Sequence, residues 1–340
     1  MPSVGSTGER LGTVSAPNAQ RSFGADVISR IQASSEYGLN RLRDAIVAQL
    51  NLMLMQLKAQ TGRTESIRML AVAGNTVMCH LFCGLSPESI GVVPFTPLSL
   101  FGEIYDADTI GIRNCEKVYV LPSVAGYVGG DIVSDLAAVQ MHSSELARDG
   151  EKETLLLDIG TNGEMVLGRS GEFVCCATAA GPAFEGAEIA MGMPAASGAI
   201  SKVWLEDEKI CCSTIDDATA VGICGSGLID ALAVFLETGL LDETGLIADE
   251  NDVDKDFAGY LGKDENGSCI WLTEEVKVTQ ADVRKLQLAK ASIAAGIQIL
   301  LEERQIAVTD VEQVILAGGF GSFLNKKSAA AIGLIPAELE

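Results

Sequence analysis

A carboxylate and a glycine turn stand together in residues 155–168, which read LLLDIGTNGEMVLG. Three leucines run into Asp158, and residues 160–163, Gly-Thr-Asn-Gly, follow before an apolar strand pattern resumes. The backbone N–H groups of such a turn can bind phosphate oxygens, while a carboxylate at the strand end can orient a hydrated Mg²⁺ or a water molecule. Because larger side chains would keep a phosphate away from the backbone, the stretch predicts a phosphate-binding loop.

Two further glycine clusters have the same potential chemistry. Residues 318–321, Gly-Gly-Phe-Gly, end a predicted strand and could let an adenosine lie against bare backbone. Residues 222–227 open a predicted helix, whose N-terminus carries partial positive charge that favours anions. Taken singly, each cluster is explained at least as well by a tight turn or a helix C-cap that needs positive φ.

The elements that must position these turns alternate between strands and helices, which implies an α/β fold. Apolar residues recur at threes and fours over residues 39–57, so we expect a long amphipathic helix there. Residues 67–76 are predicted as a buried strand that ends in a Gly-Asn turn, and residues 118–139 as a strand, a glycine-rich turn and a helix. Residues 1–22, rich in Gly, Ser, Pro and Asn, are predicted to be an irregular lead-in.

The second half has clearer patterns. Three short strands over residues 154–179 are separated by turn residues and predict an antiparallel meander. One helix is expected to begin near Gly186, and another at Thr279, where Asp282 three residues later makes a capping-box pattern. Residues 242–277 between them are predicted to be an acidic, loop-rich segment.

Composition limits the classes of function. The 340 residues, 48% hydrophobic with 36 glycines, suit a well-packed protein of one large or two ordinary domains. A net charge of −22 argues against nucleic acid or an anionic membrane as a partner. No segment resembles a signal peptide, and the apolar runs are too short to span a bilayer, so we expect a cytoplasmic protein.

The cysteines and histidines do not suggest a metal centre. The nine cysteines include no C-x-x-C pair, which favours reduced core thiols over a zinc or iron-sulfur site. His80 and His142 are the only histidines, and neither has a ligand-like neighbour in the sequence, so both are expected to be structural or solvated.

The order of the motifs resembles the nucleotide-binding scaffold shared by acetate and sugar kinases, heat-shock chaperones and actin. In that ribonuclease H-like fold, two related α/β subdomains clamp ATP. Within it, nearly all of residues 20–335 look like the reductive activators of corrinoid proteins. The stretches that carry this resemblance are RSFGADVISRI (21–31), VAGNTVMCHLFCG (72–84), VPFTP (93–97), YVGGD (127–131), DIGTNGE (158–164), ATAAGPAFEGAEI (177–189), GICGSGLIDAL (222–232), QLAKASIAAGI (287–297) and LAGGFGSFLN (316–325).

The resemblance implies a function. These activators are ATPases that return a Co(II) corrinoid to the methyl-accepting Co(I) form, with an electron from an iron-sulfur cluster. It implies ATP and Mg²⁺ as cofactors, Asp158 and Glu185 as catalytic residues and Asp158 as the metal ligand. The implied cofactor-binding residues are Gly160, Thr161, Asn162, Gly163, Gly186, Ser226, Gly227, Gly318, Gly319 and Phe320. A corrinoid protein or corrinoid methyltransferase is the implied partner, and a homodimer is compatible with this reading.

The chain also departs from the family pattern. Residues 1–22 contain no cysteine, so the iron-sulfur cluster and its electron are expected from a donor in trans. The opening hairpin, with a first aspartate-glycine loop, is expected to be missing from the first subdomain, residues 23–152, while residues 153–340 hold the second phosphate motif and the adenosine motif. Two alternatives stay open: a scaffold fragment that binds a partner without turnover, and a small-molecule kinase on the same fold.

Overall fold

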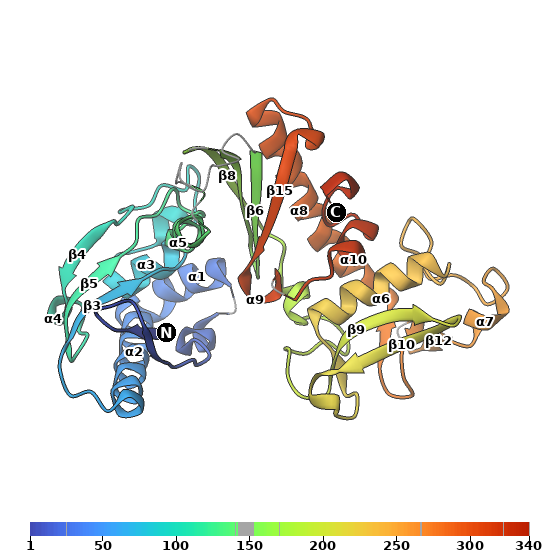
Figure 1. Ribbon diagram of the computed structural model, residues 1–340, viewed down its shortest axis with the longest axis horizontal. Helices are drawn as coiled ribbons and strands as arrows, with labels where there is room; N and C mark the ends of the chain where they lie inside the picture. The colour runs from blue at the N-terminus through green and yellow to red at the C-terminus, as the bar shows by residue number, and fades with distance from the viewer. Residues whose placement is uncertain are drawn as a thin grey trace. The chain divides into compact units, whose positions relative to one another are not determined.

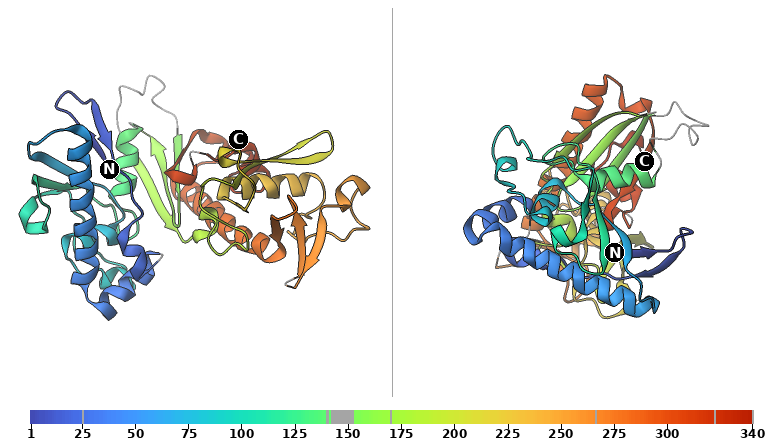
Figure 2. Two further views of the ribbon diagram at one scale, coloured as in Figure 1. Left: turned by 90° about the horizontal axis from the view of Figure 1, so that it is seen from below. Right: turned by 90° about the vertical axis from the view of Figure 1, so that its left-hand side faces the viewer.

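The computed structural model describes residues 1–24, 26–139, 141, 153–169, 171–265, 267–321 and 323–339. The chain divides into two compact units, Met1–Val139 and Gln140–Glu340, each of which is visible in Figures 1 and 2. The predicted boundary at residue 152 and the predicted role of His142 both fall outside the described residues. The assignment of residues 23–152 as an ATPase subdomain therefore stays a prediction.

The first unit is built on a sheet of order β3-β5-β4. Strand β3 (Ile67–Val72) runs parallel to β5 (Cys115–Val120), and β4 (Glu103–Asp106) runs antiparallel to it. Val118 and Val120 of β5 pack with Leu54 and Phe82 in one buried cluster. The helices of this unit are α1 (Val27–Tyr37), α2 (Leu39–Thr61), α3 (Thr76–Cys83), α4 (Ala107–Ile110) and α5 (Gly130–Ala138). The long amphipathic helix over residues 39–57 is confirmed as α2.

The prediction of an irregular lead-in was wrong. Strands β1 (Pro2–Val4) and β2 (Arg10–Thr13) form an antiparallel hairpin, and a 3₁₀ helix follows at Ala19–Phe23. Strands of three and four residues are too short to show a hydrophobic period, which is why the pattern missed them. The unit thus contains a hairpin, although residues 1–13 include no aspartate and hence no aspartate-glycine loop.

The second unit is built on a sheet of order β15-β6-β7-β8. Strands β6 (Glu153–Ile159), β7 (Gly163–Arg169) and β8 (Glu172–Thr178) form the predicted antiparallel meander, while β15 (Val311–Ala317) pairs parallel with β6. Helix α8 (Gln280–Arg304) covers β7 and β8 and begins with the predicted capping box. Because β6 and β15 are parallel neighbours, their carboxyl ends lie at the same edge of the sheet.

One prediction for the second unit was wrong and another was incomplete. No helix begins near Gly186: a 3₁₀ helix at Pro182–Glu185 ends there instead, because Gly186 takes a left-handed conformation with a φ of 77°. The segment at residues 242–277 is rich in loops as predicted, but it also contains α7 (Lys255–Ala258), β12 (Leu261–Asp264) and β13 (Gly267–Trp271) and enters β14 (Lys277–Thr279). These strands are again too short for a clear period.

The remaining elements include a sheet of order β10-β9-β11. They are β9 (Ala199–Glu206), β10 (Lys209–Thr214), β11 (Gly222–Ile223), α6 (Gly225–Glu237), α9 (Gly318–Gly321) and α10 (Lys326–Ala331). The predicted helix after residues 222–227 is confirmed as α6. Within the described ranges, no helix combines the length and the apolar character that a membrane span requires.

The cysteines are free thiols, as predicted. All nine are unpaired, and burial raises the pKa of the Cys79 thiol to about 12 and that of Cys176 to about 11. A thiol with so high a pKa stays protonated and unreactive at neutral pH. In the part of the chain that the structure describes, no three His, Cys, Asp or Glu residues are grouped to hold a metal ion.

His80 has the structural role that the sequence predicts. Its side chain is fully buried on α3, with Nδ1 lying 2.7 Å from the Thr76 carbonyl oxygen. Nε2 accepts hydrogen bonds from the backbone amides of Leu98 and Ser99, at 3.1 and 3.3 Å. An acceptor Nε2 requires the neutral ring with its proton on Nδ1, so the contacts define the tautomer.

This arrangement makes the stability of the protein depend on pH. Burial lowers the pKa of His80 below its ordinary value near 6.5, so the unfolded chain takes up a proton first as the pH falls. The contribution of the neutral, hydrogen-bonded His80 to the free energy of unfolding is therefore complete above about pH 6.5 and declines below it.

We expect denaturant titrations to show that the free energy of unfolding falls more between pH 7.5 and pH 5.5 for the native chain than for His80→Phe. The variant should also lose about 1–3 kcal/mol at pH 7.5, because two amides lose their acceptor. Identical pH dependence in the two proteins would contradict this account.

Candidate functional site

Asp158 and Gly318 meet at the shared edge of β6 and β15. Asp158 pairs in register with Ala317, the residue before Gly318, and with Glu164 on the other side. Gly318 has a φ of 83°, and a Cβ at this position would collide with the Asp158 carboxylate and with the backbone of Ile159. Glycine is therefore required at 318 by both backbone conformation and space. The structure brings the predicted phosphate loop and the predicted adenosine motif into contact.

Only part of the backbone of the loop at residues 160–163 is available to a ligand. The Gly160 amide donates to the Asn162 carbonyl at 2.9 Å, so it does not face outward as expected. In the described part of the chain, the amides of Thr161 and Asn162 have no backbone acceptor. The atoms nearest to the position that a Cβ on Gly160 would take are the Asn162 carbonyl oxygen at 3.9 Å and Glu185 Oε1 at 4.0 Å, so this face of the loop is not tightly packed. Gly163 is different, because a Cβ there would collide with Ile293 of α8, which makes it a packing residue.

Glu185 faces this loop from the 3₁₀ helix. Its Oε1 accepts a hydrogen bond from the Thr161 hydroxyl at 2.7 Å, and its side chain is exposed. Gly186 ends the 3₁₀ helix and packs against the backbone of Met193, where a Cβ would not fit. The buried Asp282 then holds the following turn by accepting from the Ala190 amide at 2.8 Å. The structure thus places Glu185 beside the phosphate loop, while Gly186 shapes the turn that carries it.

Phe320 is held by an aromatic stack that the sequence did not predict. Its ring stacks on Phe184 with centroids 5.2 Å apart and an interplanar angle of 20°. Gly225 lies against both, since a Cβ there would collide with the Phe184 carbonyl and contact the Phe320 ring. Gly319 is exposed, with nothing within 4 Å of a Cβ position. Phe320 therefore anchors α9, and Gly319 offers the open backbone that an adenosine would need.

Ser226 and Gly227 are turned toward β9 instead. The Ser226 hydroxyl donates to the Ser201 carbonyl at 3.0 Å, and Gly227 packs against the Ile200 carbonyl, where a Cβ would collide. These contacts explain both residues as packing positions of α6 on β9. A role in nucleotide binding stays a prediction for them.

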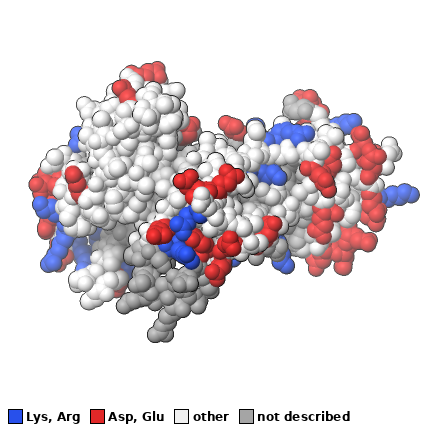
Figure 3. Space-filling model, turned by 90° about the horizontal axis from the view of Figure 1, so that it is seen from above, with Lys and Arg blue, Asp and Glu red and all other residues white. Residues whose placement is uncertain are grey.

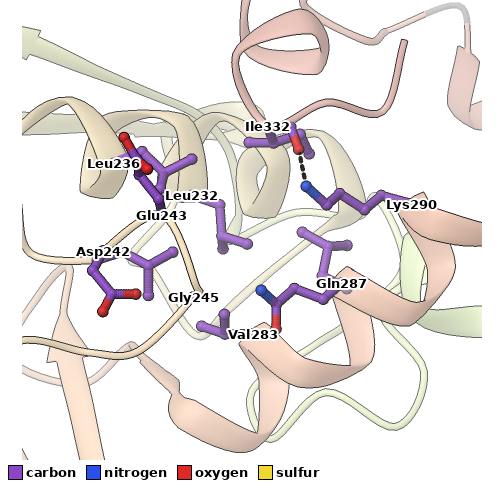
Figure 4. A pocket seen from close by; sticks show the side chains of 11 residues that line it. Leu232, Leu236, Asp242, Glu243, Gly245, Val283, Gln287, Lys290 and Ile332 are labelled. Carbon is purple, nitrogen blue, oxygen red and sulfur yellow. Dashed lines mark hydrogen bonds between the residues drawn. The ribbon is translucent and has the colours of Figure 1, made fainter. Parts of the chain in front are cut away.

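A shallow pocket of about 340 Å³, including its open mouth, lies elsewhere in the second unit (Figure 4). It contains none of the predicted site residues, so its size alone does not make it the nucleotide site. The Lys290 ammonium group at its rim donates to the Ile332 carbonyl, and burial lowers the pKa of this lysine. The pocket is lined by Leu232, Leu236, Leu241, Asp242, Glu243, Gly245, Val283, Leu286, Gln287, Lys290 and Ile332.

Comparison with known proteins agrees with this geometry. Residues 152–340 match the family model described as the C-terminal domain of RACo, the ASKHA domain, and residues 5–144 match the model described as the RACo middle region. The solved structure of a reductive activator for corrinoid, iron-sulfur protein superposes with a TM-score of 0.81 at 39% identity, covering 96% of this chain and 53% of that one. The actin-like fold expected from the sequence is confirmed by these matches.

Two curated relatives are similar along nearly the whole chain. The corrinoid activation enzyme RamQ of Eubacterium limosum is 35% identical, covering 94% of this chain and 55% of the relative. The Co(II) methylated amine-specific corrinoid protein reductase of Methanosarcina barkeri is 26% identical, covering 92% and 59%. The chain thus spans between 53% and 59% of the length of the proteins it matches. It belongs to the RACo family and carries that family's middle region and C-terminal ASKHA domain.

Proposed function

We propose that this chain is the ATP-binding and ATP-hydrolysing part of an activator that drives the reduction of Co(II) corrinoid proteins to Co(I). The observation that carries the proposal is the contact between Asp158 and Gly318, which joins a phosphate motif to an adenosine motif at one sheet edge. The names of the relatives, a corrinoid activation enzyme and a corrinoid protein reductase, supply the reaction class.

The residues at this edge fit Mg-ATP. Magnesium keeps several of its waters and needs only one or two carboxylates from the protein, and Asp158 can provide one. The loosely packed face of Gly160 and the open face of Gly319 leave room for phosphate and for adenosine. In this proposal Asp158 orients the hydrated ion, the Thr161 and Asn162 amides bind phosphate oxygens, and the Glu185 carboxylate accepts a proton from the attacking water.

Bound ATP supplies the free energy that an uphill electron transfer requires. Each roughly 60 mV of unfavourable one-electron potential costs about 1.4 kcal/mol. The electron comes from an iron-sulfur cluster held outside residues 1–340, and the partner is a corrinoid protein or corrinoid methyltransferase. A homodimer is compatible with this scheme. The nine free thiols favour the cytoplasm, where cysteines stay reduced.

The test is thermal unfolding of the full chain with Mg-ATP, with Mg-ADP and with Mg²⁺ alone as the control. A nucleotide at a hundredfold over its Kd should stabilise the protein by about 2.7 kcal/mol, an effect that Mg²⁺ alone should not produce. The absence of a shift at millimolar nucleotide would overturn the proposal. A shift without any phosphate release would support the alternative of a scaffold that binds without turnover.

A further inference from the structure

One buried carboxylate, that of Asp230 on helix α6, is not among the predicted site residues. Figure 3 shows Asp and Glu side chains spread over the surface, whereas Asp230 is only 4% exposed. Burial raises the pKa of Asp230, and hydrogen bonds from Ser328, Val203 and Asn325 act in the opposite direction. Because burying a carboxylate costs free energy that its hydrogen bonds must offset, its partners show which parts of the fold it holds together.

Asp230 joins three elements of the second unit. Its Oδ1 accepts a hydrogen bond from the Ser328 hydroxyl of α10 at 2.6 Å, in a buried contact. Its Oδ2 accepts from the Val203 amide of β9 at 3.4 Å. The side chain of Asn325 caps α10 by accepting from the Lys327 amide at 3.1 Å, and it also hydrogen-bonds to Asp230. The carboxylate therefore ties the first turn of α10 to α6 and β9.

Helix α10 follows the adenosine motif at once. Strand β15 leads into α9 at residues 318–321, and Asn325 is already the N-cap of α10. Leu324, the residue before this cap, is buried in the core, and its amide donates to the Gly321 carbonyl at 3.3 Å. So short a segment leaves little freedom between its two ends. The position of α10 therefore limits where the open backbone of Gly319 can lie.

Helix α6 contacts the adenosine motif at a second point. Gly225, in the first turn of α6, lies against the Phe320 ring, since a Cβ there would come within 2.8 Å of it. Gly225 and Asp230 belong to one helix, so a single rigid element contacts α9 through the first and α10 through the second. Figure 1 shows α10 lying beside α6. Helix α6 is thus the support on which the segment that carries Gly319 is held.

We propose that Asp230 is a positioning residue for the adenosine side of the nucleotide site, an inference that rests on the proposed function. By binding Ser328 and Asn325, it holds residues 318–325 so that the Gly319 backbone faces the adenosine. Apolar residues of similar volume could pack α10 on α6 at a lower cost in free energy. Hydrogen bonds with a defined direction fix one arrangement of the two helices, which packing of apolar groups does less well.

The test uses the full chain and two mild substitutions at the same contact. Ser328→Ala removes the donor hydroxyl, while Asp230→Asn keeps the shape of the side chain and removes its charge and one acceptor oxygen. We expect each variant to raise the Kd for Mg-ATP, measured by calorimetry, and the KM for ATP hydrolysis about tenfold, with kcat within twofold of the native value. A contact that acts equally on bound substrate and transition state changes KM alone.

A double variant and a matched control separate this role from a general loss of stability. The double variant should bind Mg-ATP no more weakly than the weaker single variant, because both changes remove one shared contact. The control is Val311→Ala, a buried residue at the opposite end of β15 from Gly318. It should lower the unfolding midpoint by a similar amount through lost packing, with Kd and KM within twofold of the native values.

Each contrary result has a distinct meaning. If Ser328→Ala and Asp230→Asn were less stable but bound Mg-ATP with native affinity, Asp230 would be a core residue only, and the proposed function would stand. An equal loss of affinity in Val311→Ala, or a fall in kcat in step with affinity, would also overturn the positioning role. A native chain that bound no Mg-ATP would overturn the proposed function and this inference together. Ser328→Ala keeps the test decisive if Asp230→Asn fails to fold.

Discussion

Replacing Asp158 with asparagine is expected to lower ATP hydrolysis by about 10²- to 10³-fold, the range that the loss of one charge-stabilising group produces in other enzymes. The substitution preserves size and removes the charge that would orient a hydrated Mg²⁺. Because Asp158 lies at the end of β6, half-buried and beside Gly318, the amide should be accommodated with a change of less than about 2 kcal/mol in the free energy of unfolding.

This expectation is checked by measuring phosphate release and, by calorimetry on the same preparation, nucleotide affinity. Asp249→Asn is the matched control, since Asp249 is an exposed aspartate of the same unit outside the site. Its hydrolysis rate should equal that of the native chain. If Asp158→Asn lost stability while hydrolysis and affinity were unchanged, Asp158 would be a turn residue only.

The adjacent glycines 318 and 319 should respond differently to alanine. Gly318→Ala places a Cβ against the Asp158 carboxylate at a φ of 83°, so we expect a loss of stability of about 1–3 kcal/mol and weak nucleotide binding. Gly319→Ala meets no neighbour and sits at a helical position of α9, so its stability should stay within about 0.5 kcal/mol of the native value.

The informative measurement is the nucleotide affinity of Gly319→Ala. If adenosine lies against bare backbone at this position, one methyl group should weaken ATP binding about tenfold, a cost of about 1.4 kcal/mol, without changing the fold. If this variant bound ATP with native affinity, the adenosine would not lie against Gly319. A fully stable Gly318→Ala would show that the contact with Asp158 adapts, contrary to the geometry described above.

The sequence by itself determined the features that depend on neighbouring residues. The meander at residues 153–178, the helix α2 and the capping box of Thr279 and Asp282 all follow from patterns within a few positions, and all are present. Short elements escaped it: the hairpin of β1 and β2 and the strands β12 to β14 have too few residues to show a period. The absence of a helix at Gly186 depends on the left-handed turn there, which packs against Met193.

Only the tertiary structure decided which glycines belong to the site. Nothing in the local sequence distinguishes Gly160 and Gly319, where a Cβ would meet no close neighbour, from Gly163 and Gly227. At those two positions Ile293 and β9 occupy the space that a Cβ would need. The contact of Asp158 with Gly318 joins residues far apart in the chain, because β15 pairs parallel with β6. The physical reason is that such contacts depend on strand order and on the packing of helices over the sheet, which a local pattern of residues does not encode.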